Sequence, residues 1–266
     1  MTHAPPPNPS SVSADFAVVA RPSFLFAAAF ALSISPHELA HGLVAFFLGF
    51  DVTLYQMWVY PEAASARPSQ LVLIALAGPL FSLLSGLLYA ALYVRRYRNS
   101  PPGLIFLFLS SISLYSFLGP LVGAAFGGDF NAAARFLSIP WPALLVFSIL
   151  GAIALPVFLF FVGRELSRWA PPRLSRWQNV LCTVLAPWIL GTSISLWLYR
   201  PLPQYLQNSS LFGSAFWLFA VLGAALGYPR RRPAPVSPAF IPADYALFAA
   251  ALLIVRALVQ GIHLSH

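Results

Sequence analysis

Long apolar segments separated by short polar connections make up most of the 266-residue chain. A helix needs about 20 mainly apolar residues to cross the hydrocarbon core of a bilayer. The segments that approach or exceed this length are residues 24–50, 71–94, 104–126, 141–163, 180–199, 211–228 and 244–264. The pattern therefore predicts an all-α polytopic membrane protein with about seven transmembrane helices. The connections are shorter than the roughly 50 residues of a small soluble domain, so we expect no appended recognition domain.

The polar stretches and glycines add detail to this plan. Residues 1–22 are rich in proline and serine, and we expect a disordered N-terminal tail without a removable signal peptide. Residues 52–60 are rich in β-branched and aromatic side chains, which fits either a hairpin at the membrane interface or an aromatic belt on an ordinary loop. Gly119, Gly123 and Gly127 recur at every fourth position, and this spacing predicts close approach of a neighbouring helix.

Charged residues are scarce and unevenly placed. Only 8% of the residues are charged, against about 25% in a soluble domain, and 59% are hydrophobic. All 15 basic residues are arginine, and they cluster between the apolar segments. This distribution favours the lipid bilayer and its anionic headgroups as partners and argues against nucleic acid. Arg256 is an exception, because it falls within the last apolar segment and there requires a partner or a water-filled cavity.

The arginine distribution also predicts an orientation. Arginines are most frequent in the connections after the second, fourth and sixth apolar segments. Cytoplasmic loops of membrane proteins carry an excess of arginine and lysine, so we expect these connections and the N-terminus in the cytoplasm. The predicted location is a cell membrane crossed several times, which we expect to be a bacterial inner membrane.

The sequence His37-Glu38-Leu39-Ala40-His41 lies inside the first apolar segment. Histidines four residues apart share one face of a helix, so both imidazoles can reach one Zn²⁺ at about 2.0–2.1 Å. Glu38 then lies beside the open position of the metal, where its carboxylate can take a proton from zinc-bound water. The single cysteine, Cys182, offers neither a disulfide framework nor a thiolate site. Histidines and carboxylates must therefore hold any metal.

A structural interpretation of the same residues stands beside the catalytic one. Ser35 fits the N-cap of a helix that begins at Pro36, with Glu38 completing a capping box. The two interpretations can coexist. Each ionisable group inside an apolar span costs on the order of 2.5 kcal/mol or more, so a functional role is favoured.

Three motifs follow one another in the order found in the site-2 protease-like intramembrane zinc metalloproteases. They are the His37–His41 sequence, then Ala77-Gly78-Pro79, then Asp129. The chain resembles that family over residues 24–135. The resemblance implies a three-helix metalloprotease core in residues 23–136, followed by additional transmembrane helices in residues 137–266.

The resemblance also implies roles for individual residues. His37, His41 and Asp129 would hold Zn²⁺, and Glu38 would be the catalytic base. Ser82 stands where the family often has an asparagine. Asp129 also fits the N-cap of a helix, because aspartate is a favoured capping residue.

The leading hypothesis is therefore a zinc-dependent metalloendopeptidase that hydrolyses peptide bonds in membrane-embedded or juxtamembrane protein segments. Its cofactor would be Zn²⁺ and its partner a membrane protein substrate. The alternative is a non-catalytic membrane protein, either a pseudoprotease that binds clients or a small-solute transporter whose Gly-Pro breaks line a site at the midplane. The intact Glu38 favours the enzyme.

Overall fold

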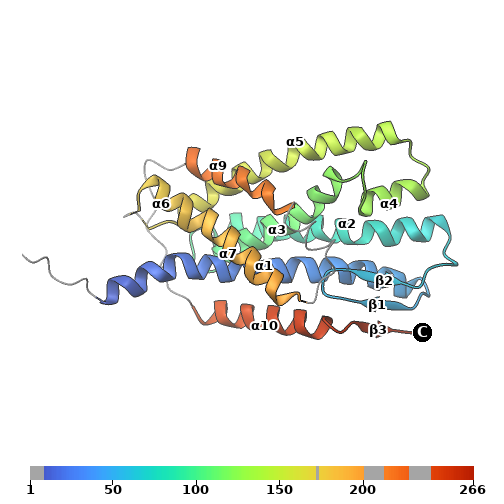
Figure 1. The fold of residues 1–266 in the computed structure, drawn as a ribbon, viewed down its shortest axis with the longest axis horizontal. Helices are drawn as coiled ribbons and strands as arrows, with labels where there is room; N and C mark the ends of the chain where they lie inside the picture. Colours follow the sequence, from blue (N-terminus) through green and yellow to red (C-terminus); the bar gives the residue numbers. More distant parts are fainter. Residues whose placement is uncertain (1–8, 172–173, 201–212, 228–240) are drawn as a thin grey trace, which may run out of the picture.

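A computed structural model describes residues 9–171, 174–200, 213–227 and 241–266, with side chains from residue 17 onward. The helices form an elongated bundle with a small sheet at one end (Figure 1). The elements are α1 (Pro9–Phe47), β1 (Val52–Leu54), β2 (Val59–Pro61), α2 (Pro68–Leu92), η1 (Tyr93–Tyr97), α3 (Gly103–Val122), α4 (Asp129–Phe136), α5 (Trp141–Leu166), η2 (Ser167–Trp169), α6 (Arg176–Val180), η3 (Leu181–Leu185), α7 (Ala186–Leu198), η4 (Ala215–Trp217), α9 (Leu218–Leu226), α10 (Pro242–Leu258) and β3 (Ile262–Leu264).

Within the described residues, five helical segments are long and apolar enough to cross a membrane. They are Ala17–Phe47, Pro68–Tyr97, Gly103–Val122, Trp141–Trp169 and Arg176–Leu198. These segments support a multi-pass membrane protein. The predicted count of seven is not confirmed, because the described part of the sixth segment is the short helical stretch Ala215–Leu226. The seventh becomes α10, which ends at Leu258 before the chain turns into β3.

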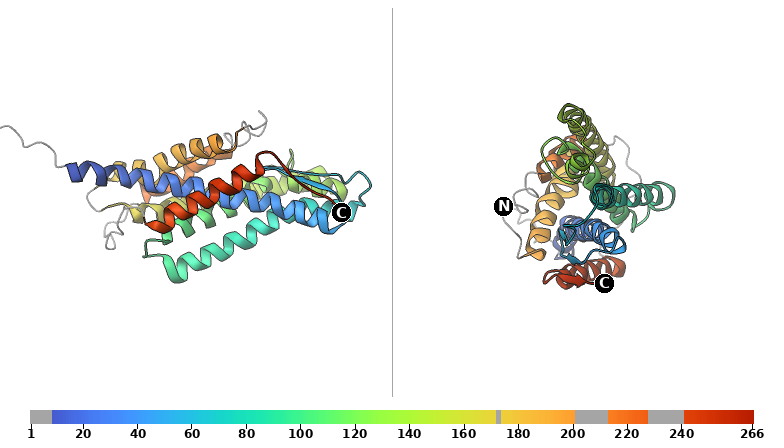
Figure 2. Two further views of the ribbon diagram at one scale, coloured as in Figure 1. Left: turned by 90° about the horizontal axis from the view of Figure 1, so that it is seen from below. Right: turned by 90° about the vertical axis from the view of Figure 1, so that its right-hand side faces the viewer.

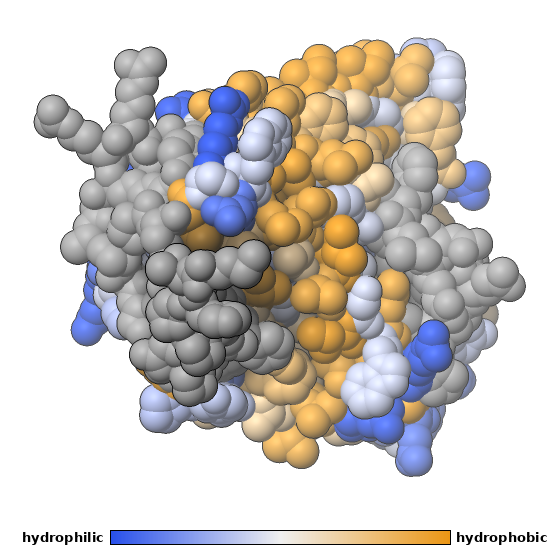
Figure 3. Space-filling view, turned by 60° about the vertical axis from the view of Figure 1, so that its left-hand side comes forward, coloured by the Kyte–Doolittle hydropathy of each residue, from blue (hydrophilic) through white to orange (hydrophobic). Residues whose placement is uncertain are grey.

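Apolar side chains on the outside of the bundle fit a lipid environment. Within α2 and α5, only 28% of the most apolar stretch is buried inside the protein. Leu84, Leu88, Ile153 and Phe161 are all more than half exposed. Figure 3 shows an apolar band across one face of the molecule, with hydrophilic residues on either side of it. Exposed apolar surface of this extent indicates a partner such as lipid.

Helix α1 is the centre of the bundle and contacts α2, α3, α7 and α10 (Figures 1 and 2). Small side chains make this close packing feasible, because Ala27, Ala28, Ala29 and Ala31 are all at most 1% exposed. The largest core cluster is formed mainly by residues of α1, α3, α5 and α9, and its member Phe108 is fully buried. The histidine motif is therefore carried by the most enclosed helix of the fold.

Of the two alternatives for residues 52–60, a hairpin or an aromatic loop, the structure contains the hairpin. β1 and β2 pair antiparallel with Thr53 opposite Tyr60, and the amide of Tyr55 donates to the carbonyl of Trp58 at 2.9 Å. The third strand, β3, was not predicted. It pairs with the other edge of β1 and places His263 opposite Thr53, so the sheet order is β2-β1-β3.

The N-terminal part of α1 corrects the predicted tail. Residues 9–22 are the first turns of the helix, whereas residues 1–8 lie outside the described part of the chain. A buried ion pair accounts for the ordering: Arg21 Nε donates to Asp244 Oδ2 at 2.7 Å, and both side chains are at most 3% exposed. The cap predicted at Ser35 is also wrong, because α1 continues through Pro36.

Two further expectations differ from the structure. A Cβ added at Gly119 or Gly127 would meet no neighbouring helix, so the prediction of close helix packing at these glycines is wrong. Close approach occurs instead where Gly163 of α5 meets the backbone of Ala220 in α9. Arg256 does not lie at mid-span, because it belongs to the last turn of α10 and is exposed. A side chain at a helix end can reach the interface without a buried partner.

The described arginine-rich connections gather at one end of the bundle, opposite the sheet (Figure 1). Arg98 follows η1, and its Nη2 donates to Glu165 Oε1 near the end of α5 at 2.6 Å. Arg173 and residues 230–232 belong to the same predicted set but lie outside the described residues. The shared end fits the predicted cytoplasmic face.

Candidate metal centre

The last turns of α1 place two imidazoles side by side. His37 and His41 are 6% and 5% exposed, and their rings meet edge to face with 4.9 Å between centroids. The hairpin packs directly behind this turn, because a Cβ at Gly42 would collide with the side chain of Leu54. The glycine therefore allows the sheet to brace the histidine-bearing part of α1.

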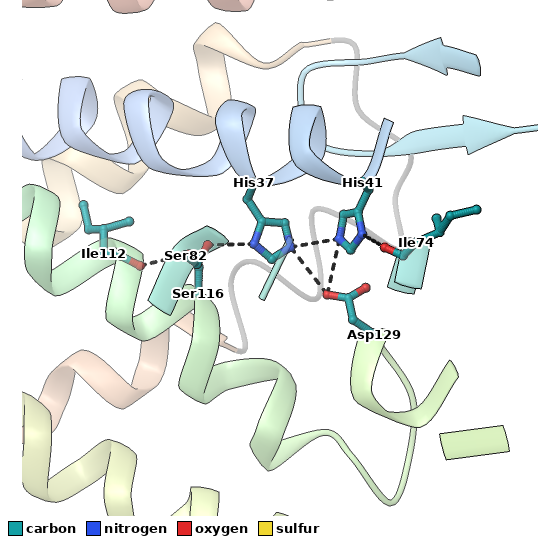
Figure 4. Close-up of polar contacts among 7 residues, drawn as sticks. All are labelled: His37, His41, Ile74, Ser82, Ile112, Ser116 and Asp129. Carbon is teal, nitrogen blue, oxygen red and sulfur yellow. Dashed lines mark hydrogen bonds and ion pairs between the residues drawn. The ribbon is translucent and has the colours of Figure 1, made fainter. Parts of the chain in front are cut away.

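Asp129 closes a triangle with these two imidazoles (Figure 4). The Nε2 atoms of His37 and His41 lie 3.2 Å apart, and Asp129 Oδ2 lies 3.4 Å from the first and 3.7 Å from the second. Ligand atoms at about 2.05 Å from a tetrahedral metal are separated by about 3.3–3.4 Å. The three atoms thus have the spacing of one face of a tetrahedral zinc site. Among the described residues, no other group of three histidine, cysteine or acidic side chains comes this close together.

Hydrogen bonds on the far side of each ring set its orientation. His41 Nδ1 donates to the carbonyl of Ile74 at 2.6 Å, since a carbonyl can only accept. This fixes the proton on Nδ1 and leaves the lone pair of Nε2 for a metal. His37 Nδ1 lies 2.8 Å from the hydroxyl of Ser82. Both partners belong to α2, so that helix orients both imidazoles.

Gly78 supplies the space between the histidines. A Cβ at this position would lie 2.6 Å from Nε2 of His37 and closer still to Nε2 of His41. These distances resemble Zn–N bonds of about 2.0–2.1 Å, so an alanine methyl would occupy the space that the ion requires. Pro79 follows directly and lacks the N–H that continues the helical hydrogen-bond ladder. The Gly-Pro pair therefore leaves room beside the histidines, and α2 continues through it.

Asp129 reaches this site because the chain breaks after α3. That helix ends at Val122, and Gly128 has a φ of 82°, a left-handed conformation that favours glycine. α4 begins at Asp129, and Asn131 Nδ2 donates to the carbonyl of Ala124 at 2.8 Å, which holds the turn in place. The predicted third segment is thus followed by a turn and a second helix, α4, and this turn brings Asp129 next to the two histidines.

The environment of Asp129 keeps its carboxyl ionised. Burial raises the pKa of this group, but hydrogen bonding to His37 and His41 outweighs burial and holds the pKa well below the usual range. An ionised carboxylate beside two imidazole nitrogens is a suitable donor set for Zn²⁺. The residues present therefore fit the metal that the sequence predicts.

Glu38 lies beside this triangle at the wall of a cavity of about 280 Å³. Residues of α1, α3, α7 and η4 line most of this cavity, and His37 and Asp129 are among its lining residues. Most of the other lining side chains are apolar, among them Phe30 and Trp217. An apolar cavity that ends at a metal site and a carboxylate could accept an apolar segment and expose it to a base.

The structure brings together all four predicted site residues: His37, Glu38, His41 and Asp129. The sequence does not point to the carbonyl of Ile74, because any residue on a neighbouring helix offers such an acceptor. Ser82 stands out in the sequence only as a departure from a family pattern, and its contact with His37 gives it a role. Comparisons with protein-family models, with curated proteins and with solved structures find no match.

Proposed function

We propose that the protein is an intramembrane zinc metalloendopeptidase, similar to the site-2 proteases, that hydrolyses peptide bonds in membrane-embedded or juxtamembrane protein segments. The observation that carries this proposal is the triangle of two imidazole nitrogens and one carboxylate oxygen with Glu38 beside it, on a helix long and apolar enough to cross a membrane. If these residues had only a structural role, three buried or half-buried ionisable groups would lie in an apolar bundle with no function to offset the free-energy cost of burying them.

His37, His41 and Asp129 would hold the metal and leave one position open. When bound there, Zn²⁺ lowers the pKa of a coordinated water to about 7 and polarises a carbonyl. Glu38 accepts a proton as the water oxygen bonds to the scissile carbonyl carbon. As the carbon–nitrogen bond breaks, Glu38 delivers that proton to the leaving amine. The carboxylate therefore ends the cycle in its starting state.

The substrate must reach this site as an extended segment. A transmembrane helix hides its carbonyls in hydrogen bonds, so it must unwind locally before attack. The sheet near the site can hold an extended segment by strand addition. β1 is paired on both sides, so only the outer edges of β2 and β3 are open to such pairing.

Newly formed N-termini in a bacterial membrane give a direct test of the proposal. The chain and its Glu38→Gln variant are each expressed in the same strain, and the N-termini of its membrane proteins are compared by mass spectrometry. We expect N-termini within or next to apolar segments that appear with the wild type and are absent with Glu38→Gln, while both proteins bind equal zinc. Identical sets of N-termini would contradict the proposal and favour a non-catalytic protein.

A further inference from the structure

The cavity beside Glu38 has room for one large side chain of a substrate. Its volume of about 280 Å³ is nearly twice that of an apolar cavity of about 150 Å³ that binds one benzene molecule. Pockets that enclose a whole drug-sized ligand measure about 300–1,000 Å³. A stretch of several residues therefore does not fit inside this cavity, whereas a single ring such as an indole does.

Aromatic rings form much of the cavity wall. Phe26 and Phe30 of α1, Tyr115 of α3 and Trp217 of η4 all line it. The rings of Phe26 and Trp217 meet edge to face with 5.0 Å between centroids, and both residues are at most 3% exposed. Edge-to-face contacts between aromatic rings are more favourable than their buried area alone predicts. A further aromatic ring inside the cavity can make the same kind of contact with this wall.

Two serine hydroxyls in the wall are already used by their own helices. Ser116 Oγ donates to the carbonyl of Ile112 at 2.9 Å (Figure 4), and Ser195 Oγ donates to the carbonyl of Gly191 at 2.8 Å. A hydroxyl has a single proton, so neither serine has one left to donate to an occupant. A polar group that entered the cavity would lose its water without gaining these donors in return. The wall therefore favours an apolar occupant.

The cavity shares a face of α1 with the proposed metal ligands. Phe30, Ile34 and His37 follow one another at spacings of four and three residues, so their side chains lie on one side of the helix. His37, Glu38 and Asp129 also line the cavity. A side chain inside the cavity must therefore belong to a residue close to the bond that reacts.

We propose that this cavity is a specificity pocket, which takes an aromatic side chain from the substrate residue next to the scissile bond. This inference rests on the proposed function and names its substrate class: membrane-protein segments with phenylalanine or tryptophan beside the cut bond. A side chain anchored in the cavity holds the segment next to Glu38. Orientation of this kind accelerates a reaction beyond the effect of binding alone.

Two neighbouring positions on α7 provide a test variant and its matched control. Thr192 lines the cavity and is half-buried, so Thr192→Phe places a ring in the space meant for the substrate. The fold should persist in this variant, because filling a cavity commonly stabilises a protein. Ser193, the next residue, is exposed on the outside of α7. Ser193→Phe therefore adds the same ring to the same helix outside the cavity.

Single-pass reporter proteins that the wild type cuts test the pocket directly. In each reporter, the residue on one side of the cut bond is either alanine or phenylalanine, and both sides are tested in turn. At one of these two positions, we expect wild-type kcat/KM to be about 10- to 100-fold higher with phenylalanine than with alanine. This ratio should fall to near one in Thr192→Phe and keep its wild-type value in Ser193→Phe. A wild-type ratio near one, or an unchanged ratio in Thr192→Phe, would overturn the proposal.

Thermal unfolding with and without indole gives a measurement that needs no substrate. The proteins are purified in detergent with zinc, and the quantity compared is the change in unfolding midpoint that indole causes. Indole in the cavity stabilises the folded protein, so this change should be about 2–4 °C more positive in wild type and Ser193→Phe than in Thr192→Phe. Effects of indole on the detergent are common to all three proteins and cancel in this comparison. Equal changes in all three would contradict a pocket for an aromatic ring.

The two measurements separate this inference from the proposed function. If the wild type cuts no reporter, the proposed peptidase fails, whereas the indole comparison still decides whether the cavity takes an aromatic ring. If the wild type cuts reporters without regard to the neighbouring side chain, the peptidase stands and the specificity pocket fails.

Discussion

Substitution of Gly78 by alanine adds a single methyl group at the point where the metal would lie. The added Cβ would be 2.6 Å from Nε2 of His37, whereas ordinary contact begins near 3.4 Å. His37 would therefore have to retreat by about 0.8 Å, and His41, which is closer, by more. Metal sites tolerate changes of only about 0.2 Å in ligand distance. The variant should lose the zinc site while keeping its helix.

Loss of the helix is not an alternative explanation for such a result. Alanine in a helix interior is more favourable than glycine by about 0.5–1 kcal/mol, so α2 should be at least as stable in Gly78→Ala. Gly119→Ala is the matched control, because the nearest atom to its new Cβ, in Tyr115, is 3.9 Å away. The two variants therefore make the same chemical change with and without a steric conflict.

Zinc affinity measured by competition with a chelator in detergent distinguishes these variants. Loss of a residue that only supports a ligand typically weakens metal affinity by about 10- to 100-fold, and a methyl group in the metal position should exceed that range. Gly119→Ala should bind zinc like the wild type. If Gly78→Ala bound zinc with unchanged affinity, the ion could not lie between His37 and His41.

Three further predictions follow from the same contacts. Ser82→Ala removes the hydroxyl that orients His37, so zinc affinity in the chelator competition should fall by about 10- to 100-fold. Asp129→Ala should bind little zinc by elemental analysis, whereas Asp51→Ala, which alters a carboxylate outside the triangle, should bind as the wild type does. Asp244→Asn leaves a buried guanidinium without its charged partner and should destabilise the fold by about 3–5 kcal/mol in thermal unfolding. Glu165→Gln, the corresponding change in a more exposed ion pair, should destabilise the fold less.

Most of the site is predictable from the sequence because its signals are local. Histidines four residues apart must share a helical face, and this spacing alone is enough to bring His37 and His41 together. Asp129 is predicted by the resemblance to the site-2 protease-like family, which rests on the order of three motifs. Its depth is not predictable, because hydropathy does not show that α3 stops at Val122 and that Gly128 turns the chain.

The features that the sequence does not predict depend on contacts between distant parts of the chain. Thr53 and His263 pair across the sheet although 210 residues separate them, and three-residue strands have no distinctive pattern. Arg21 lies within α1 and pairs with the distant Asp244. The proline-rich sequence before Arg21 indicates neither the helix nor this partner. Tertiary contacts of this kind override local composition.

X-ray absorption at the zinc edge, on detergent-purified wild-type protein, tests the central assignment most directly. A site of His37, His41 and Asp129 predicts one tightly bound zinc per chain, with nitrogen and oxygen neighbours at about 2.0–2.1 Å and the outer-shell scattering of two imidazoles. A sulfur neighbour at about 2.3 Å would implicate Cys182 and contradict the assignment. Protein that retains no zinc after purification would contradict it equally.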